Sequence, residues 1–265
     1  MRATTGELLK IAEECCREAV RFLRTGGADV TTTAKGPFDY VTGADTAVED
    51  LIVAALRAAL PGSAIVAEER GTRPGDGVTW YLDPIDGTGN FLRGLPMACV
   101  SLGAAVDGRM VAGCVYDLFR DECFTGGAGE PFRAEPASWL PEPQIADRPL
   151  VLTDLPLPGQ VNGPAMELVA TLLGTAEVRR LYCTALSLAW VAAGRADVAC
   201  NLGIWPWDVA AGAALVEAAG GTYIPVGGES AQTARGFVAV APGRDLGFGE
   251  WLAGELAGVG PLMSL

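Results

Sequence analysis

An apolar run that ends in two carboxylates constrains this chain more than any other stretch. Residues 78–82 (Val-Thr-Trp-Tyr-Leu) predict a buried strand, and Asp-Pro-Ile-Asp-Gly-Thr-Gly-Asn-Phe follows directly at 83–91. Two carboxylates at one strand end repel each other unless a cation lies between them. Carboxylate oxygens suit Mg²⁺ or Mn²⁺. The strand end therefore predicts a divalent-metal site that includes Asp83 and Asp86.

Small residues follow the second carboxylate. Gly87, Thr88 and Gly89 allow a ligand to approach the backbone closely, and free N–H groups at the start of the next helix can hold a phosphate. A cation beside a phosphate cradle is the chemistry of phosphoryl transfer. The alternative is that Asp-Pro-x-Asp-Gly is only a turn, because Asp, Pro and Gly are turn residues. Acids at matching positions elsewhere would favour the metal site.

Such acids occur before and after this motif. Glu68 and Glu69 close a predicted short strand at 64–67, whose end we expect beside Asp83 if the two strands are neighbours. The alternative is that the glutamate pair is solvated surface. Asp45 stands at the start of a predicted helix over 45–60, where an acid is also a common helix cap.

A further acid, Asp208, begins a predicted helix that ends near residue 219. Taken by itself, it is better explained as an N-cap beside a favourable helix dipole. The small residues Ala210, Ala211 and Gly212 favour a second role, because they let this helix end approach another element closely.

Composition excludes several classes of function. The chain has no histidine, which excludes Ser-His-Asp and Cys-His catalysis and His-ligated zinc, so a general base must be another group. The net charge of −13 argues against binding to nucleic acid or an anionic membrane. The seven cysteines are odd in number and lack a C-x-x-C pair, which predicts free thiols and a cytoplasmic protein. We expect neither a signal peptide nor a membrane span.

The chain divides into two predicted halves. Residues 1–135 form an N-terminal α+β half that carries the metal and phosphate motifs, and 136–265 form a C-terminal α/β half in which strands and helices alternate. Residues 126–149 are rich in Gly, Pro and Glu and are interpreted as a long surface connection that holds the boundary. Asp107-Gly108 predicts a hairpin between two apolar runs. Both halves are expected to form one compact catalytic unit.

The ordered motifs resemble those of the inositol monophosphatase-like family, the lithium-sensitive, Mg²⁺-dependent phosphatases. The shared segments are D-P-[IL]-D-G-T-x-N-F at 83–91, W-D-x-A-A-G at 207–212, the Glu pair at 68–69 and the early K-x(3)-D-x-V-T-x-x-D segment at 35–45. The resemblance runs from about residue 5 to 245. The resemblance implies an α/β (α+β) fold, an alternating α-β-α-β-α layered sandwich, and a homodimer.

The resemblance also implies residue roles. Glu68, Asp83 and the Ile85 carbonyl would hold one metal, Asp83, Asp86 and Asp208 a second, and Glu68 a weaker third, so two to three Mg²⁺ ions are expected, with Mn²⁺ as a substitute. The N–H groups of Gly87 and Thr88 would bind phosphate. Asp45, the Thr88 hydroxyl and Glu68 would orient and deprotonate the attacking water, with Lys35 as a supporting charge. The substrate pocket would include Asp86, Thr184, Ala185, Asn201 and Trp205.

Three departures from the family pattern bear on the substrate. Gly89 replaces a Thr or Ser, Asn201 replaces a Glu of the inositol-specific branch, and Trp205-Pro206 replaces a smaller, more polar pair. The first prediction is a phosphomonoesterase for a small polyol or sugar phosphate. The alternatives are the same chemistry on a 3′-nucleotide, nucleoside-type or histidinol phosphate, which a tryptophan could hold by stacking, and a catalytically silent regulatory homologue.

Overall fold

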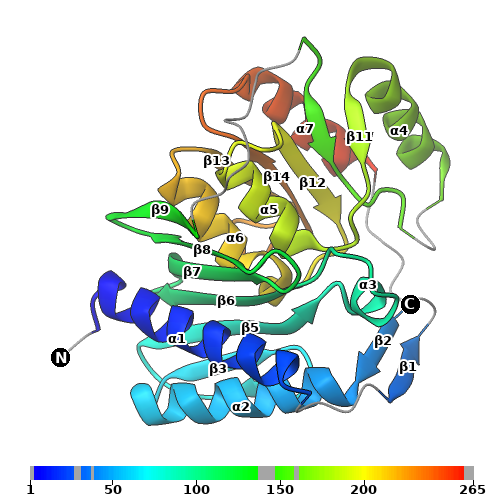
Figure 1. The fold of residues 1–265 in the computed structure, drawn as a ribbon. Helices are drawn as coiled ribbons and strands as arrows, with labels where there is room; N and C mark the ends of the chain where they lie inside the picture. Colours follow the sequence, from blue (N-terminus) through cyan, green and yellow to red (C-terminus); the bar gives the residue numbers. More distant parts are fainter. Residues whose placement is uncertain (1–2, 27–30, 37–38, 137–146, 158–160, 260–265) are drawn as a thin grey trace.

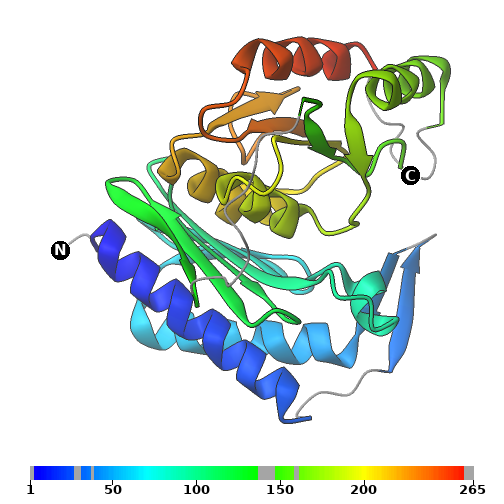
Figure 2. The same cartoon turned by 45° about the horizontal axis from the view of Figure 1, so that its top comes forward.

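The fold alternates layers of helices and sheets. A computed structural model describes residues 3–26, 31–36, 39–136, 147–157 and 161–259, with side chains except those of 34–36, 39 and 40. Helix pairs and two sheets stack in the order α-β-α-β-α, which Figure 2 shows from a second direction. The predicted α/β layered sandwich is confirmed.

The larger sheet has seven strands in the order β4-β3-β5-β6-β7-β8-β9. Strands β3 and β5 are parallel, and the other neighbours are antiparallel. The predicted hairpin is confirmed, because Val106 pairs with Arg109 across Asp107-Gly108. The strands are β3 (Ala64–Ala67), β4 (Gly71–Arg73), β5 (Val78–Asp86), β6 (Cys99–Val106), β7 (Arg109–Asp117), β8 (Glu122–Gly127) and β9 (Glu130–Glu135).

Strand β9 corrects one prediction. It pairs with β8 inside the stretch 126–149, which the sequence predicted to be a surface connection. Exposed and half-buried residues alternate along β9, as expected for an edge strand with one solvated face. Residues 137–146 lie outside the described part of the chain, and the boundary between the two halves at 135/136 stays a prediction.

Helices α1 (Thr5–Arg24) and α2 (Gly43–Ala59) cover the outer face of this sheet. Helix α1 begins at a capping box in which Thr4 and Glu7 bond reciprocally. Helix α2 begins earlier than predicted, because Thr42 and not Asp45 is its N-cap. The stretch before it is a hairpin, β1 (Thr32–Gly36) with β2 (Asp39–Thr42), which the sequence analysis did not predict.

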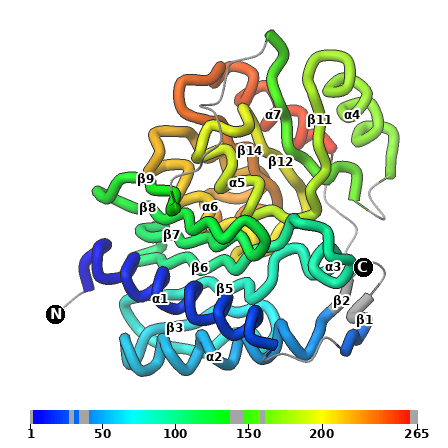
Figure 3. Tube along the Cα trace, in the orientation of Figure 1, coloured from blue at the N-terminus to red at the C-terminus, as the bar shows by residue number. Residues whose placement is uncertain are grey.

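The second sheet has five strands in the order β11-β10-β12-β14-β13. Helices α5 and α6 lie between the two sheets, and α4 and α7 cover the outer face of the second; the path is easiest to follow in Figure 3. A short helix, α3 (Thr88–Leu92), follows β5. The remaining elements are β10 (Leu150–Leu152), α4 (Gly163–Thr175), β11 (Glu177–Arg179), α5 (Thr184–Ala192), β12 (Val198–Leu202), α6 (Pro206–Ala218), β13 (Thr222–Val226), β14 (Gly236–Val240) and α7 (Leu246–Gly258).

Small residues bring α6 close to the larger sheet. A Cβ atom built on Gly103 of β6 would lie 2.7 Å from the Ala211 nitrogen, and one on Gly113 of β7 would lie 2.3 Å from the Ala211 oxygen. Any side chain at these two glycines would therefore push α6 away. The predicted close approach of this helix is confirmed, and it positions Asp208 at the start of α6 near the end of β5.

Among the described residues, no helix is both long and apolar enough to cross a membrane.

Candidate active site

Two parallel strand ends bring the first two acids together. Ala67 of β3 lies opposite Leu82 of β5, and the Glu68 N–H donates to the Leu82 carbonyl at 3.2 Å. Glu68 and Asp83 therefore leave neighbouring strands at adjacent positions. The register of β5 on β6 shifts between Asp83 and Asp86, so the second carboxylate follows an irregularity in the pairing.

Four acids form an electrostatically coupled cluster, which we call the carboxylate cluster: Glu68, Asp83, Asp86 and Asp208. Burial raises the pKa of Asp83 well above its usual range, and the charges of the other three raise it further. The pKa of Asp208 is also raised well above its usual range, by burial and then by Asp86 and Glu68. Burial raises the pKa of Asp86 to about 6. Each charge thus opposes ionisation of its neighbours.

The charge and burial of this cluster favour a divalent cation, although among the described residues no three of its carboxylates have ligand atoms within 4.8 Å of one another. Asp83 is only 3% exposed, and its Oδ1 has no hydrogen-bond partner among the described residues. A buried carboxylate oxygen without a partner is costly, and the charges of three further carboxylates act on Asp83. A cation with a preference for oxygen ligands would satisfy this atom and remove the mutual repulsion.

Asp208 has two contacts that explain its place at the helix start. It is the third residue of α6, and its Oδ2 accepts the Trp205 N–H at 2.7 Å. The carboxylate therefore takes part in capping α6, although the N-cap residue is Trp205. Its charge also raises the pKa of Asp83, which lies in the neighbouring layer. Asp208 therefore has a second interaction besides capping.

A second hydrogen-bonded group lies beside the cluster. The Thr88 hydroxyl is 3.1 Å from Asp45 Oδ1 and 2.9 Å from the Ile85 carbonyl oxygen. Asp45 is fully buried, and its Oδ2 accepts both the N–H (2.8 Å) and the hydroxyl of Thr42. The Asp45 carboxylate is therefore held in one orientation, facing the Thr88 side chain.

Gly87 forms the turn between β5 and α3. It has a φ of 84°, in the left-handed region that favours glycine, and a Cβ atom there would lie 2.6 Å from the Met97 carbonyl oxygen. Asn90 fixes the far side of this turn, because its amide donates to the carbonyls of Met97 and Leu181. The turn is thus tied to both halves of the chain.

Asp86 connects the cluster to the middle helix layer. Its Oδ2 accepts the Ala185 N–H at 2.6 Å, at the start of α5. Ala185 is fully buried. The neighbouring Thr184 hydroxyl is 3.3 Å from the Asn201 amide nitrogen.

The side-chain amide of Asn201 forms hydrogen bonds with other residues of the chain. It is 5% exposed, its Oδ1 accepts the Asp154 N–H at 2.7 Å, and its Nδ2 lies 3.2 Å from Asp154 Oδ2. Trp205, by contrast, is 60% exposed and stacks on Trp207, with ring centroids 5.4 Å apart and planes 9° apart. Lys35 lies in β1, and its side chain is outside the described part of the structure.

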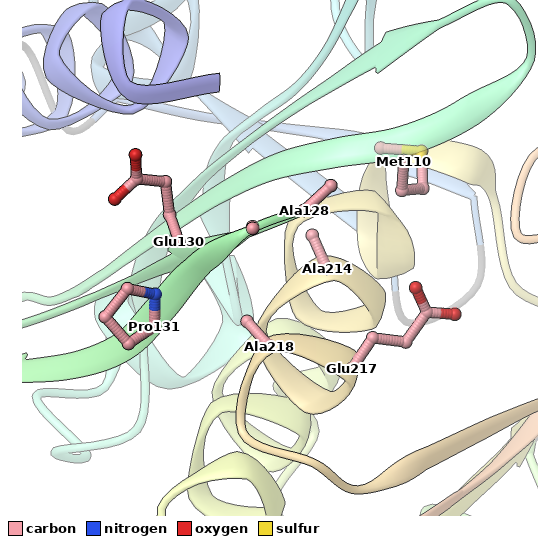
Figure 4. Close-up of a pocket in the computed structure, with 9 residues that line it drawn as sticks. Met110, Ala128, Glu130, Pro131, Ala214, Glu217 and Ala218 are labelled. Carbon is pink, nitrogen blue, oxygen red and sulfur yellow. The ribbon is translucent and has the colours of Figure 1, made fainter. Parts of the chain in front are cut away.

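The hollow drawn in Figure 4 lies elsewhere. Its volume is about 400 Å³, and it is bounded by the turn between β8 and β9 and by α6, including Met110, Glu130 and Glu217. It contains no member of the carboxylate cluster. We therefore base the candidate site on the cluster and not on this hollow.

Comparisons with known proteins identify the family. The sequence model of the inositol monophosphatase family matches residues 2–255. The chain belongs to this family. The resemblance to this family that the motifs indicated is thus confirmed.

Relatives and solved structures agree with this assignment. The chain is 36% identical over 244 residues to a protein named Nus factor SuhB from Pasteurella multocida (89% of this chain, 91% of the relative). It is 35% identical over 223 residues to an inositol-1-monophosphatase from Mesorhizobium japonicum (81% and 84%). The inositol monophosphatase structure from an Anabaena (Nostoc) species superposes with a TM-score of 0.77 at 30% identity, covering 96% of this chain and 97% of that one.

Sequence reasoning missed two groups that position candidate site residues. Thr42 orients Asp45, and the signal for it was present, since Thr42 and Asp45 have the spacing of a capping box. Asp154 holds Asn201 and also accepts the Tyr182 N–H at 2.8 Å. No local pattern marks Asp154, because its partners come from other segments of the chain.

Proposed function

We propose that this chain is a Mg²⁺-dependent phosphomonoesterase that hydrolyses a small polyol or sugar phosphate. The observation that carries the proposal is the burial and electrostatic coupling of Asp83 with the other three acids of the carboxylate cluster, together with its buried Oδ1, which is unpartnered among the described residues. Family membership and the inositol-1-monophosphatase relative support this reaction class.

The cluster supplies the ligands for the metal. Glu68, Asp83 and the Ile85 carbonyl would hold one ion, Asp83, Asp86 and Asp208 a second, and Glu68 a weaker third, with Mn²⁺ as a substitute. When bound, Mg²⁺ lowers the pKa of water and neutralises phosphate charge. The absence of histidine is compatible with this chemistry, because carboxylates both bind the metal and accept protons.

The chain's own groups position the reactants. Asp45 is held by Thr42 and faces the Thr88 hydroxyl. We assign this pair, together with Glu68, to orienting the attacking water and accepting its proton. The N–H groups of Gly87 and Thr88 hold the phosphate oxygens, and Lys35 adds a positive charge near the water.

Removing the Thr88 hydroxyl tests this role. Thr88→Val is expected to lower kcat by about a hundredfold, the lower end of what a general acid–base contribution gives. Thr88→Ser keeps the hydroxyl between Asp45 and Ile85 and is the matched control, expected to retain most of the turnover. Equal losses in the two variants would show that the side-chain shape and not the hydroxyl matters.

The substrate pocket lies toward α5, β12 and the start of α6. Asp86, Thr184, Ala185, Asn201 and Trp205 are its proposed residues. Because the Asn201 amide is bonded to Asp154 and Thr184, we infer that it positions Thr184. Trp205 is the most exposed of these proposed pocket residues.

A second candidate substrate class follows from the stacked Trp205 and Trp207 rings. An exposed, flat indole face can stack on a nucleobase or an imidazole, which favours a nucleotide, nucleoside-type or histidinol phosphate. Phosphate release from inositol, sugar, 3′-nucleotide and histidinol phosphates tests the choice. We expect the highest kcat/KM with a polyol or sugar phosphate. If Trp205→Ala selectively weakens turnover of a flat substrate that the wild type prefers, the second class is correct.

A catalytically silent regulatory homologue is the third possibility. Several relatives bear the name Nus factor SuhB, which describes those proteins. The argument against silence in this chain is that it keeps all four acids of the cluster. Buried acids that repel one another destabilise a fold that does not use them.

A further inference from the structure

Two buried thiols lie behind the Asp86 carboxylate. Cys99 comes from β6 and Cys183 precedes α5, and their sulfur atoms are 3.7 Å apart. Cys183 Sγ is 3.4 Å from Asp86 Oδ2, and Cys99 Sγ is 3.9 Å from the same oxygen. Cys99 is 0% and Cys183 1% exposed. Three potential ligand atoms from three separate segments of the chain thus lie within 4.8 Å of one another.

The distances match those around a tetrahedral zinc ion. With Zn–S near 2.3 Å and Zn–O near 2.0–2.2 Å, two sulfurs lie about 3.8 Å apart and a sulfur and an oxygen about 3.5–3.7 Å apart. The observed separations are 3.7 Å between the sulfurs and 3.4 and 3.9 Å from sulfur to oxygen. The three side chains are therefore arranged for such an ion without a change of backbone.

We propose that Asp86, Cys99 and Cys183 form a binding site for a thiophilic divalent cation of the Zn²⁺ class, and that its occupation inhibits the enzyme. The donor set separates this site from the carboxylate cluster, because two thiolates select soft ions and disfavour Mg²⁺. The sites share Asp86. Binding stands on the geometry alone, whereas inhibition also rests on the proposed phosphatase function.

Binding of the ion changes the protonation of the two thiols and no oxidation state. Both thiols lose their protons to solvent when the ion binds, and no electron is transferred. Two thiolates and one carboxylate then surround a 2+ ion, and a fourth position stays open. The Asp86 oxygen that accepts the Ala185 N–H would also contact the ion, so the ion competes for the carboxylate that connects the cluster to α5.

The chain contains a matched control for this site. Cys114 and Cys123 are also buried, with sulfurs 3.6 Å apart, on the adjacent strands β7 and β8. Among the described residues, no Asp or Glu ligand atom joins this second pair. The two pairs therefore differ in the third ligand and not in the spacing or burial of the thiols.

Cobalt absorption provides a readout that does not depend on catalysis. The full chain is titrated with Co²⁺ in excess Mg²⁺, which would fill the carboxylate cluster and competes with Co²⁺ only at Asp86, and with TCEP to keep the thiols reduced. We expect a thiolate-to-cobalt charge-transfer band that saturates at one equivalent and is displaced by Zn²⁺. The band should disappear in Cys99→Ala and persist in Cys114→Ala. Cys99→Ser is a second variant at this position, in case Cys99→Ala fails to fold, and circular dichroism checks the folding of both.

Inhibition is measured on the same proteins with Mg²⁺ in excess. Losing one of three ligands is expected to raise the Zn²⁺ concentration for half-inhibition at least about tenfold, since even changes to groups behind a metal ligand cost 10–100-fold in affinity. Cys114→Ala should match the wild type.

Several outcomes would overturn the proposal. No band in the wild type, a band unchanged in both Cys99 variants, or a band lost only in Cys114→Ala would each contradict the site. A normal band without Zn²⁺ inhibition of an active enzyme would contradict the inhibitory role. A wild type that turns over no phosphate ester would contradict the proposed function, and the cobalt band would still decide the site.

Discussion

Replacing Asp83 by Asn is expected to reduce metal-dependent phosphate release at least about a hundredfold, because a proposed ligand of both ions is lost and even outer groups of a metal site contribute 10–100-fold. The same change should raise the Tm of the metal-free protein. Asp83 is a buried carboxylate whose charge is opposed by burial and by Glu68, Asp86 and Asp208, and Asn keeps its shape without that charge. Each kcal/mol gained would add about 2–4 °C in a chain of this size.

Asp117→Asn is the matched control for this variant. Asp117 is also fully buried, but its carboxylate accepts the N–H groups of Phe119 and Arg120 and pairs with the Arg120 guanidinium at 2.9 Å. Loss of these charge-assisted bonds should cost about 1–3 kcal/mol and lower the Tm. Below its unfolding temperature, this variant should keep most of its phosphate release.

The opposite signs of the two Tm changes are the informative result. A buried carboxylate that serves the fold stabilises it, whereas one that serves a metal destabilises the metal-free fold. If Asp83→Asn lowered the Tm as Asp117→Asn does, Asp83 would be a structural residue, and the interpretation of the carboxylate cluster would be wrong.

The stabilisation of the protein by Mg²⁺ is expected to grow as the pH rises from 5 to 8. Burial and mutual repulsion raise the pKa of Asp83 and Asp208 well above the unfolded value, and burial raises that of Asp86 to about 6. Above about pH 4, the typical unfolded value, the folded chain therefore holds more protons than the unfolded chain, so the metal-free protein loses stability as the pH rises through the folded pKa values. Mg²⁺ binds the ionised carboxylates and reverses this loss.

The size of the effect follows from mass action. At a Mg²⁺ concentration 100 times the Kd, the stabilisation is about 2.7 kcal/mol, which corresponds to about 5–11 °C in Tm. Thermal unfolding with Mg²⁺ and with EDTA at each pH measures it. Other groups with a raised pKa, such as the buried Glu49, whose two carboxylate oxygens accept the N–H groups of Glu69 and Arg70, affect both curves equally and cancel in the difference. A difference that is constant with pH would contradict the assignment of the cluster.

The sequence predicted the local parts of the site better than their connections. The apolar run before Asp83 and the Asp-Gly turn at 107–108 are strong short-range signals, and both appear as predicted. The positions of Glu68 and Asp208 relative to Asp83 depend on strand order and on packing between layers. The acids that follow the predicted strands suggested this arrangement. The structure establishes it through the register of β3 on β5 and the approach of α6 to Gly103 and Gly113.

The errors have physical causes. Strand β9 is polar and has no apolar alternation to mark it as a strand, although it forms a hairpin with the strand directly before it, across Ala128-Gly129. The β1–β2 hairpin lacks an apolar alternation of its own. Asp154 and Asn201, and likewise Cys99 and Cys183, meet only through the tertiary structure, so no spacing along the chain could predict them. The homodimer and the third metal position stay predictions from the resemblance.

Phosphate release by the wild-type chain, measured with Mg²⁺, then with EDTA, and again after Mg²⁺ is restored, tests the central claim most directly. The substrate panel is inositol, sugar, 3′-nucleotide and histidinol phosphates. We predict turnover of at least one of these esters that EDTA abolishes and that added Mg²⁺ recovers. Turnover that EDTA leaves unchanged, or no turnover of any ester by a folded protein that Mg²⁺ measurably stabilises, would contradict the proposed function.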